Sequence, residues 1–273
     1  MLRCEWPPGE HPLTSPRLAR PTGSTKEFGL ERLWDATLAS TQSSATVRGG
    51  ALPAELRARY DGELAIALHP DRPTVIANFV SSLDGVVAFD TDESSGGGEV
   101  SGFFDPDRFV MGLLRSMADV VLVGAGTLRA APSHEWTPRR VNPGSAQLFD
   151  QWRSNLGLAA QPTTMVATAS GGIDPTHPGL SAPDVPVVIA ATPAGADRLA
   201  NLDLGAHVRV EVAGDGPAVG AARLVDLAAG LGARLVLCEG GPHLIGDLLA
   251  AGLLDQLFLT LAPQLAGRDE GRP

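Results

Sequence analysis

Apolar residues repeat along the chain at two spacings, and from residue 74 onward the two spacings alternate. Short, continuously apolar runs rich in valine, isoleucine and leucine predict buried strands, whereas apolar residues at every third or fourth position predict helices. The predicted strands cover 74–82, 120–124, 163–170, 185–192, 207–213, 234–241 and 255–265, and the predicted helices cover 105–118, about 145–155, about 193–202, 218–231 and 242–252. Strands without polar alternation are typical of a sheet covered on both faces, and helices between them make right-handed parallel crossovers. The pattern therefore predicts an α/β fold with a mostly parallel, doubly wound sheet.

The helix expected at 105–118 shows the helical spacing most clearly. Phe109, Leu113 and Met117 stand four residues apart on one face, with Asp105 expected as the N-cap and Pro106 as the first helical residue. The Gly/Ser-rich stretch 90–102 is expected to be a loop, and residues 130–160 are expected to be irregular apart from their one helix.

The first 70 residues are less regular. Five prolines within 1–23 predict a disordered leader. Ser24 and Glu27 fit a capping box that opens a helix over 25–39, followed by a linker at 40–52 and a second short helix at 53–60. We therefore divide the chain into a leader (1–23), an N-terminal helical extension with linker (24–70) and a main domain (71–273).

Composition narrows the class of function. The formal net charge is −10 and no run of lysine or arginine occurs, which argues against non-specific nucleic-acid binding. Cys4 and Cys238 stand alone, so neither a disulfide framework nor a cysteine-based zinc site is expected. No apolar stretch reaches the roughly 18 residues of a membrane span, and the N-terminus lacks the apolar core of a secretory signal. The expected protein is soluble and cytoplasmic, without a membrane partner.

Two glycine-bearing strand ends are the main candidates for a ligand site. The first is VLVGAGTLR, where Gly124, Gly126 and Thr127 follow a strand and leave room for a diphosphate, although a simple tight turn explains the same residues. The second is CEGGPHLIGDLL, where a strand ends at Glu239 and a helix begins after two glycines, an anion-accepting arrangement. Glu239 is either a ligand-binding carboxylate or a solvated one. We predict that the two strand ends converge in space to hold a diphosphate group.

A third motif, SSLDG at 81–85, is weaker taken alone. Asp84 is read equally well as a turn residue, and Arg115 as a cation that complements the dipole of its helix. The six histidines form no metal-binding cluster, and no nucleophile with its base stands out, so hydrolytic and metal-assisted chemistry lack support.

Taken together, ANFVSSLDG, SGFFDPDRFVMGLLRSMADVVLVGAGTLR and LVLCEGGPHLIGDLLAAGLLDQLFLTLAPQLAG resemble the C-terminal reductase domain of the bifunctional riboflavin-synthesis deaminase/reductase, and stand-alone actinobacterial pyrimidine reductases still more closely. The resemblance spans about 74–267. It implies a dihydrofolate-reductase-like fold, use of NADPH and a homodimer. The zinc deaminase signals of the bifunctional proteins are missing here, so the chain is not expected to be bifunctional. It also implies that the chain stops before a final pair of strands, which would leave the strand at 255–265 with an open apolar edge.

The resemblance also implies roles for individual residues. Asp84 and Glu239 match positions at the reacting centre, and Ser101, Arg115 and Glu239 match substrate contacts, with Arg115 on the ribose phosphate. Arg129, beside the turn, is a candidate for the 2′-phosphate of NADPH. The matched cofactor positions are Val80, Gly124, Gly126, Thr127, Ser170, Gly240, Gly241, Pro242, His243, Leu244, Ile245 and Gly246.

The implied reaction is NADPH-dependent reduction of 5-amino-6-(5-phosphoribosylamino)uracil to its ribitylamino product in riboflavin biosynthesis. The protein would mainly place the nicotinamide carbon against the ribose carbon. Two alternatives remain open from the sequence. One keeps the fold but reduces dihydrofolate or another pteridine, and the other is a non-catalytic or truncated nucleotide-binding paralogue.

Overall fold

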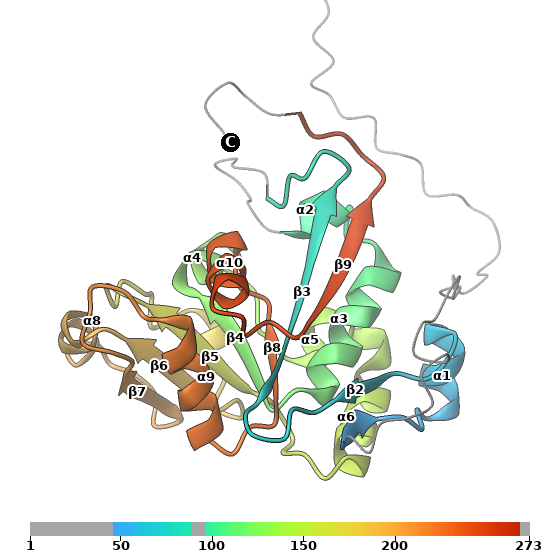
Figure 1. The fold of residues 1–273 in the computed structure, drawn as a ribbon, viewed down its shortest axis with the longest axis horizontal. Helices are drawn as coiled ribbons and strands as arrows, with labels where there is room; N and C mark the ends of the chain where they lie inside the picture. The colour runs from blue at the N-terminus through green and yellow to red at the C-terminus, as the bar shows by residue number, and fades with distance from the viewer. Residues whose placement is uncertain (1–45, 89–96, 268–273) are drawn as a thin grey trace, which may run out of the picture.

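The computed structural model describes residues 46–88 and 97–267, and its centre is a seven-stranded sheet in the order β7-β6-β5-β4-β8-β3-β9. Every strand pairing in this sheet is parallel. Figure 1 shows β7 at one edge and β9 beside β3 at the other. The strands are β3 (Thr74–Ser82), β4 (Val120–Gly124), β5 (Thr163–Thr168), β6 (Val187–Ala191), β7 (Val208–Val212), β8 (Leu235–Cys238) and β9 (Gln256–Ala262).

Helices cover both faces of the sheet, which confirms the doubly wound arrangement expected from the apolar strands. One core packs α3 and α6 against the sheet, and the opposite core packs α9 and α10. The helices of the main body are α2 (Gly97–Ser101), α3 (Asp105–Met117), α4 (Ala125–Ala130), α5 (Pro138–Val141), η2 (Pro143–Ser145), α6 (Ala146–Asn155), α7 (Pro178–Ser181), α8 (Pro193–Leu199), α9 (Ala221–Gly230) and α10 (Pro242–Ala250).

The segment before β3 packs onto the same body. Strand β1 (Val47–Gly49) pairs antiparallel with β2 (Ala65–Ala67), and α1 (Ala54–Tyr60) lies between them. Leu56 and Ile66 are fully buried in the core that also holds α3. The structure therefore corrects the linker expected at 40–52, of which 47–49 form a strand. The leader and the helix expected at 25–39 lie outside the described residues.

Other differences from the sequence-based expectation concern short elements. The loop expected over 90–102 contains α2, and the turn expected after β4 is the six-residue helix α4. Helix α3 begins one residue earlier than expected, because Phe104 is its N-cap and Asp105 is already helical. A single helical turn leaves too few positions for a 3.6-residue period to be recognised, which explains why α2, α4, α5 and α7 were not predicted.

Candidate active site

The strands β4 and β8 are neighbours in the middle of the sheet, and their carboxyl ends lie side by side. We call this end of the parallel strands the carboxyl edge of the sheet. The strands are neighbours, and the Glu239 N–H donates a hydrogen bond of 2.9 Å to the Leu122 carbonyl oxygen just beyond the paired residues. The hydroxyl of Thr127 lies 3.6 Å from the point that a Cβ on Gly241 would occupy. The two glycine-bearing turns singled out in the sequence therefore lie side by side, as parallel neighbouring strands require.

The turn after β8 is built for close approach of a ligand to the backbone. Pro242 opens the nine-residue helix α10 with Gly241 as its N-cap, so the first N–H groups of the helix have no partner within the helix. Gly124 has no atom within 4 Å of the place of a Cβ, and for Gly126 the nearest atom is at 4.0 Å. These open positions let a diphosphate approach the backbone of the turn after β4.

The other residues expected in this turn differ in accessibility. His243 and Gly246 are exposed, whereas the Leu244 and Ile245 side chains pack toward the core behind the sheet. A Cβ on Gly240 would stand 2.6 Å from the Leu244 side chain. Leu244 and Ile245 can thus contribute backbone groups to a ligand, but their side chains support the helix.

A hollow of about 490 Å³ opens beside Ser170, at the carboxyl ends of β5 and β6. Thr192 forms part of its wall and is fixed by hydrogen bonds to the Ala169 carbonyl and from the Gly195 N–H, at 2.5 and 3.1 Å. The remaining lining residues are Ala169, Pro193, Ala194, Asp215, Gly216 and Pro217. The hollow continues the same edge of the sheet away from Glu239 and has the size of a pocket for one small organic group.

Two arginines from different helices reach the loop next to Ser170. Arg129 of α4 donates to the Gly172 carbonyl at 3.4 Å, and a guanidinium nitrogen of Arg198 of α8 lies 3.8 Å from where a Cβ on Gly172 would stand. Both side chains are exposed, and neither forms an ion pair with a carboxylate within the described residues. Arg198 was not singled out in the sequence, because a lone arginine in a short helix gives no signal.

Arg115 and Glu239 form a buried ion pair. The guanidinium donates to both carboxylate oxygens of Glu239, at 2.9 and 2.5 Å, and the two side chains are 0% and 5% exposed. Its remaining donors reach the carbonyl oxygens of Glu135 and Thr137 at 3.2 and 3.1 Å and Nε2 of His134 at 2.9 Å. All five N–H groups of Arg115 are therefore used.

This pairing changes the role expected of Arg115. A phosphate could reach the guanidinium only if one of its five partners were given up, so in this structure Arg115 holds Glu239 in place rather than presenting a free donor. Arg115 does not cap its own helix either, because Arg153 donates to the carbonyl oxygens at the end of α3, including that of Ala118 at 2.8 Å. Burial, followed by the charge of Arg115, lowers the pKa of His134 to about 3, so its ring is neutral and accepts the hydrogen bond from Arg115.

Asp84 lies in the turn after β3 and binds protein groups. Its carboxylate accepts hydrogen bonds from the Ser82 hydroxyl and from the N–H groups of Ala266 and Gly267, at 2.5, 3.1 and 2.7 Å. The hydroxyl of Ser82 and then the Ala266 N–H lower the pKa of Asp84 to about 2. An acid of this strength is ionised at neutral pH, so Asp84 ties the segment after β9 to β3 and is unsuited to donating a proton.

Ser101 is the last residue of α2, and Val80 of β3 lies against the same helix, 3.0 Å from where a Cβ on Gly97 would stand. Val80 packs with Val100 and Ala262 in a small separate cluster, and the Ser101 hydroxyl donates to the Gly98 carbonyl at 3.2 Å. Beside them stands Asp107, a buried carboxyl of α3 that was not predicted as a site residue. An aspartate in the first turn of a helix is so common that its position carried no functional signal.

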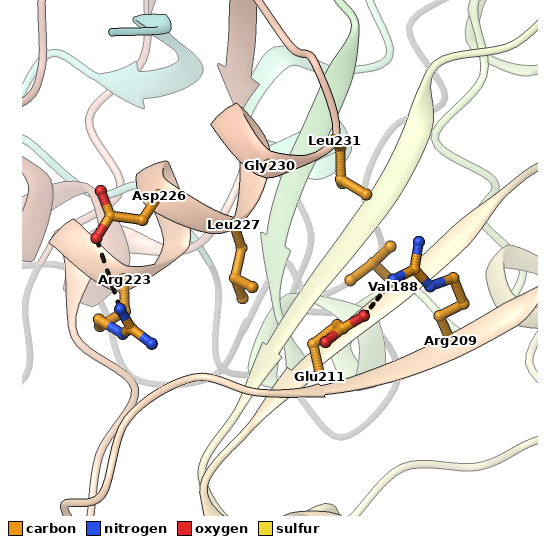
Figure 2. Close-up of a pocket in the computed structure, with 8 residues that line it drawn as sticks. All are labelled: Val188, Arg209, Glu211, Arg223, Asp226, Leu227, Gly230 and Leu231. Atoms are coloured by element: carbon orange, nitrogen blue, oxygen red, sulfur yellow. Dashed lines mark hydrogen bonds and ion pairs between the residues drawn. The ribbon is translucent and has the colours of Figure 1, made fainter.

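A separate groove of about 310 Å³ lies between α9 and strands β6 and β7, away from this edge. Figure 2 shows that its charged side chains pair with each other, Arg209 with Glu211 and Arg223 with Asp226. It offers no unpaired charge and is not a candidate site. Across 46–88 and 97–267 no cluster of three metal-ligating side chains occurs, and no helix has the length and apolarity needed to cross a membrane.

Comparison with known proteins identifies the family. Residues 73–273 match the model of the RibD C-terminal domain. The chain belongs to this family. It is 29% identical over 210 residues to the 2,5-diamino-6-ribosylamino-4(3H)-pyrimidinone 5′-phosphate reductase of Methanothermobacter thermautotrophicus, covering 74% of this chain and 82% of that protein.

Solved structures share the fold. A pyrimidine reductase-like protein from Corynebacterium diphtheriae superposes with a TM-score of 0.54 at 22% identity, covering 72% of this chain and 77% of that one. The riboflavin biosynthesis reductase of Saccharomyces cerevisiae gives a TM-score of 0.52 at 16% identity, covering 74% and 78%. Together with the parallel sheet, these likenesses confirm the expected dihydrofolate-reductase-like α/β fold.

Proposed function

We propose that this chain is an NADPH-dependent reductase of the riboflavin pathway, which reduces the ribosyl group of 5-amino-6-(5-phosphoribosylamino)uracil to the ribitylamino product. The observation that carries the proposal is the contact of the Thr127 turn with the Gly241 turn, directly beside the buried Glu239. Membership of the RibD C-terminal domain family and the named reductase from Methanothermobacter support the same reaction class.

The residues present fit a dinucleotide. The open positions at Gly124 and Gly126 and the N-terminus of α10 suit the diphosphate, and the hollow beside Ser170 suits the adenosine. When bound, the reduced nicotinamide supplies a hydride. The chain's own contribution is to hold the pyrimidine against it, with the Glu239 carboxylate accepting hydrogen bonds from ring or ribose groups while Arg115 keeps that carboxylate in place.

Arg129 and Arg198 carry the preference for NADPH over NADH. Both reach Gly172 beside the adenosine hollow, and two guanidinium groups that pair with no carboxylate among residues 46–88 and 97–267 suit a phosphate dianion. Replacing either by alanine is expected to raise the Kd of NADPH by about 10- to 100-fold, since a hydrogen bond to a charged group contributes roughly 1.5–3 kcal/mol. The Kd of NADH should stay within about twofold. Equal loss for both dinucleotides would remove the two arginines from this role.

The decisive experiment is turnover with purified protein. NADPH oxidation is followed at the nicotinamide absorbance band with the phosphoribosylamino uracil, with its 2,5-diamino counterpart and with dihydrofolate. We expect turnover with a phosphoribosyl-pyrimidine and none with dihydrofolate. Turnover of dihydrofolate alone would favour the pteridine alternative, and absence of dinucleotide binding to folded protein would favour the non-catalytic one.

We also propose a homodimer, and edge strand β9 is the surface that supports it. Strand β9 is the outermost strand of the sheet on this side. Leu257, Leu259 and Leu261 lie on one face of it and are 47%, 44% and 60% exposed, so they form an apolar stripe. An exposed stripe of this kind is typical of an association surface. Replacing Leu259 and Leu261 by glutamate should convert a dimer to a monomer in sedimentation velocity. A monomeric wild type would refute the proposal.

A further inference from the structure

The loop between α4 and α5 contacts the guanidinium of Arg115 on the side away from Glu239. The carbonyl oxygens of Glu135 and Thr137 accept hydrogen bonds from Nη1 at 3.2 and 3.1 Å, and Nε2 of His134 lies 2.9 Å from Nη2. Because a guanidinium can only donate, the His134 ring accepts this hydrogen bond and carries its own proton on Nδ1. Nε and Nη2 also donate to the two carboxylate oxygens of Glu239, at 2.9 and 2.5 Å. Arg115 therefore joins this loop to the Glu239 carboxylate.

His134 differs from the other loop partners of Arg115 because it acts through its side chain. Within the described residues, the remaining hydrogen bonds between this loop and Arg115 go to backbone carbonyl oxygens, which no substitution removes. A guanidinium is planar and rigid, so fixing one edge of it also fixes the plane in which the other edge meets a carboxylate. The place of the His134 ring therefore helps to set the orientation of both carboxylate oxygens of Glu239.

The loop is itself anchored to α7. Nδ1 of His177 accepts a hydrogen bond from the Gly179 N–H at 3.0 Å, so its Nε2 carries the proton and donates to the Ala131 carbonyl oxygen, also at 3.0 Å. The buried ring of Trp136 stacks on the His177 ring with centroids 5.9 Å apart and meets the His134 ring edge-on at 5.2 Å. The His134 ring is thus held by packing as well as by its hydrogen bond, which suits a side chain that orients another one.

We propose that His134 is a positioning residue for the substrate, because it holds the Arg115 guanidinium and thereby keeps the Glu239 carboxylate in the orientation that accepts hydrogen bonds from the pyrimidine or its ribose. The inference rests on the proposed function, from which it takes the role of Glu239. Each carboxylate oxygen has two acceptor sites, so the bidentate pair with Arg115 leaves one on each oxygen for a substrate N–H or O–H. Without the His134 ring the guanidinium can rotate, and the carboxylate turns with it.

The first test compares His134→Ala, which removes the acceptor, with His134→Gln, whose side-chain carbonyl can replace it. In the alanine variant kcat/KM for the phosphoribosylamino uracil should fall by about 10- to 100-fold, since a misplacement of about 1 Å costs about this much. The glutamine variant should stay within about threefold of wild type. The Kd of NADPH, measured by calorimetry, should stay within about twofold in both, because the Thr127 and Gly241 turns are made by other residues.

The matched control is His207→Ala. Nε2 of His207 also hydrogen-bonds to a backbone carbonyl oxygen, that of Leu180, at 2.8 Å, but this ring is not among the partners of Arg115. The control variant should keep the kcat/KM of the wild type. A His134→Ala enzyme with kcat/KM within about threefold of wild type, or a glutamine variant as impaired as the alanine variant, would overturn the proposal.

The second test asks whether His134 acts through Glu239. In a Glu239→Gln background the charged carboxylate that His134 orients is already absent, so adding His134→Ala should lower kcat/KM by no more than about threefold. A general loss of stability would instead lower kcat/KM in both backgrounds alike. A second loss as large as the first would mean that His134 acts by another route, and the proposal would then be wrong.

A third measurement needs no turnover. Nitrogen NMR of protein labelled at arginine, with Arg115→Met to assign the signal, reports the Nε–H group that donates to Glu239. We expect this hydrogen to exchange with solvent slowly in the wild type and in His134→Gln, and at least about tenfold faster in His134→Ala. Equal exchange in all three proteins would overturn the proposal whatever the kinetics show. Failure of the proposed function looks different, because the wild type then turns over no pyrimidine although the exchange of the Arg115 signal still depends on His134.

Discussion

Replacing Arg115 by methionine tests whether the buried pair with Glu239 supports the fold or awaits a phosphate. Methionine fills much of the same volume but removes the positive charge and all five donors. Glu239 is then a carboxylate with 5% exposure and no cation, and His134 and two carbonyl oxygens also lose their donor. The substitution distinguishes the two roles because support of the fold can be measured without a ligand, whereas phosphate binding cannot.

Breaking a buried ion pair on one side costs about 3–5 kcal/mol, because the remaining charge is left uncompensated. With 0% exposure of Arg115, screening by solvent does not reduce this figure. A loss of this size shifts the folding equilibrium by a factor of hundreds to thousands, since about 1.4 kcal/mol is tenfold. The double variant Arg115→Met, Glu239→Gln should regain part of the loss, because it removes the orphaned charge.

The assay is urea unfolding followed by tryptophan fluorescence and circular dichroism, without ligands. We expect a lower midpoint for Arg115→Met at an unchanged slope, and partial recovery in the double variant. If Arg115 instead serves a phosphate, the single variant should unfold like wild type, and its KM for the phosphorylated substrate should rise. A destabilisation below about 1 kcal/mol would refute the structural role of the pair.

Three further predictions concern acid stability and the ligand turn. The pKa of His134 is lowered to about 3 in the folded protein, against about 6.5 when unfolded, so the stability it contributes is present above about pH 6.5 and is lost as the pH falls toward 3. His134→Gln should therefore flatten the fall in Tm between these two pH values. The pKa of Asp84 is lowered to about 2, so the stability it contributes is present above about pH 3.9 and is lost as the pH falls toward 2. Asp84→Asn should remove this loss of Tm at low pH and speed hydrogen exchange at the Gly267 N–H. Gly241→Ala places a methyl group 3.6 Å from the Thr127 hydroxyl, at the turn where we propose that the diphosphate binds. It should weaken dinucleotide binding, measured by calorimetry, with little change in Tm.

The five inner strands of the sheet could be predicted from the sequence because they are buried on both faces, whereas β7 and β9 at the two sides are partly exposed. Continuous apolar runs such as 120–124 and 187–191 are long enough to be distinguished from turns, and all seven strands of the sheet were expected near their observed places. The order of the strands could not be read from the runs themselves, since each apolar strand can pair with any other. The structure supplies that order, and the residues predicted only that the sheet would be mostly parallel.

The site was only partly predictable, because sequence motifs identify residues but not their partners. Glu239 and Arg115 were both expected near the substrate, yet nothing in their positions, 124 residues apart, indicated that they bind each other. Asp107 was not predicted because an aspartate at the start of a helix is common and indicates no function by itself. His134 stands in a stretch without periodicity, where no neighbour can be inferred.

The three carboxyl groups near this edge show why partners, and not residue types, decide the chemistry. Asp84 accepts two backbone N–H groups and a hydroxyl, so it is a fixed anion that holds a loop. Glu239 faces a guanidinium, so it is a fixed anion available to a substrate. Asp107 is buried and accepts a hydrogen bond from the Thr260 hydroxyl, and burial raises its pKa above the usual value.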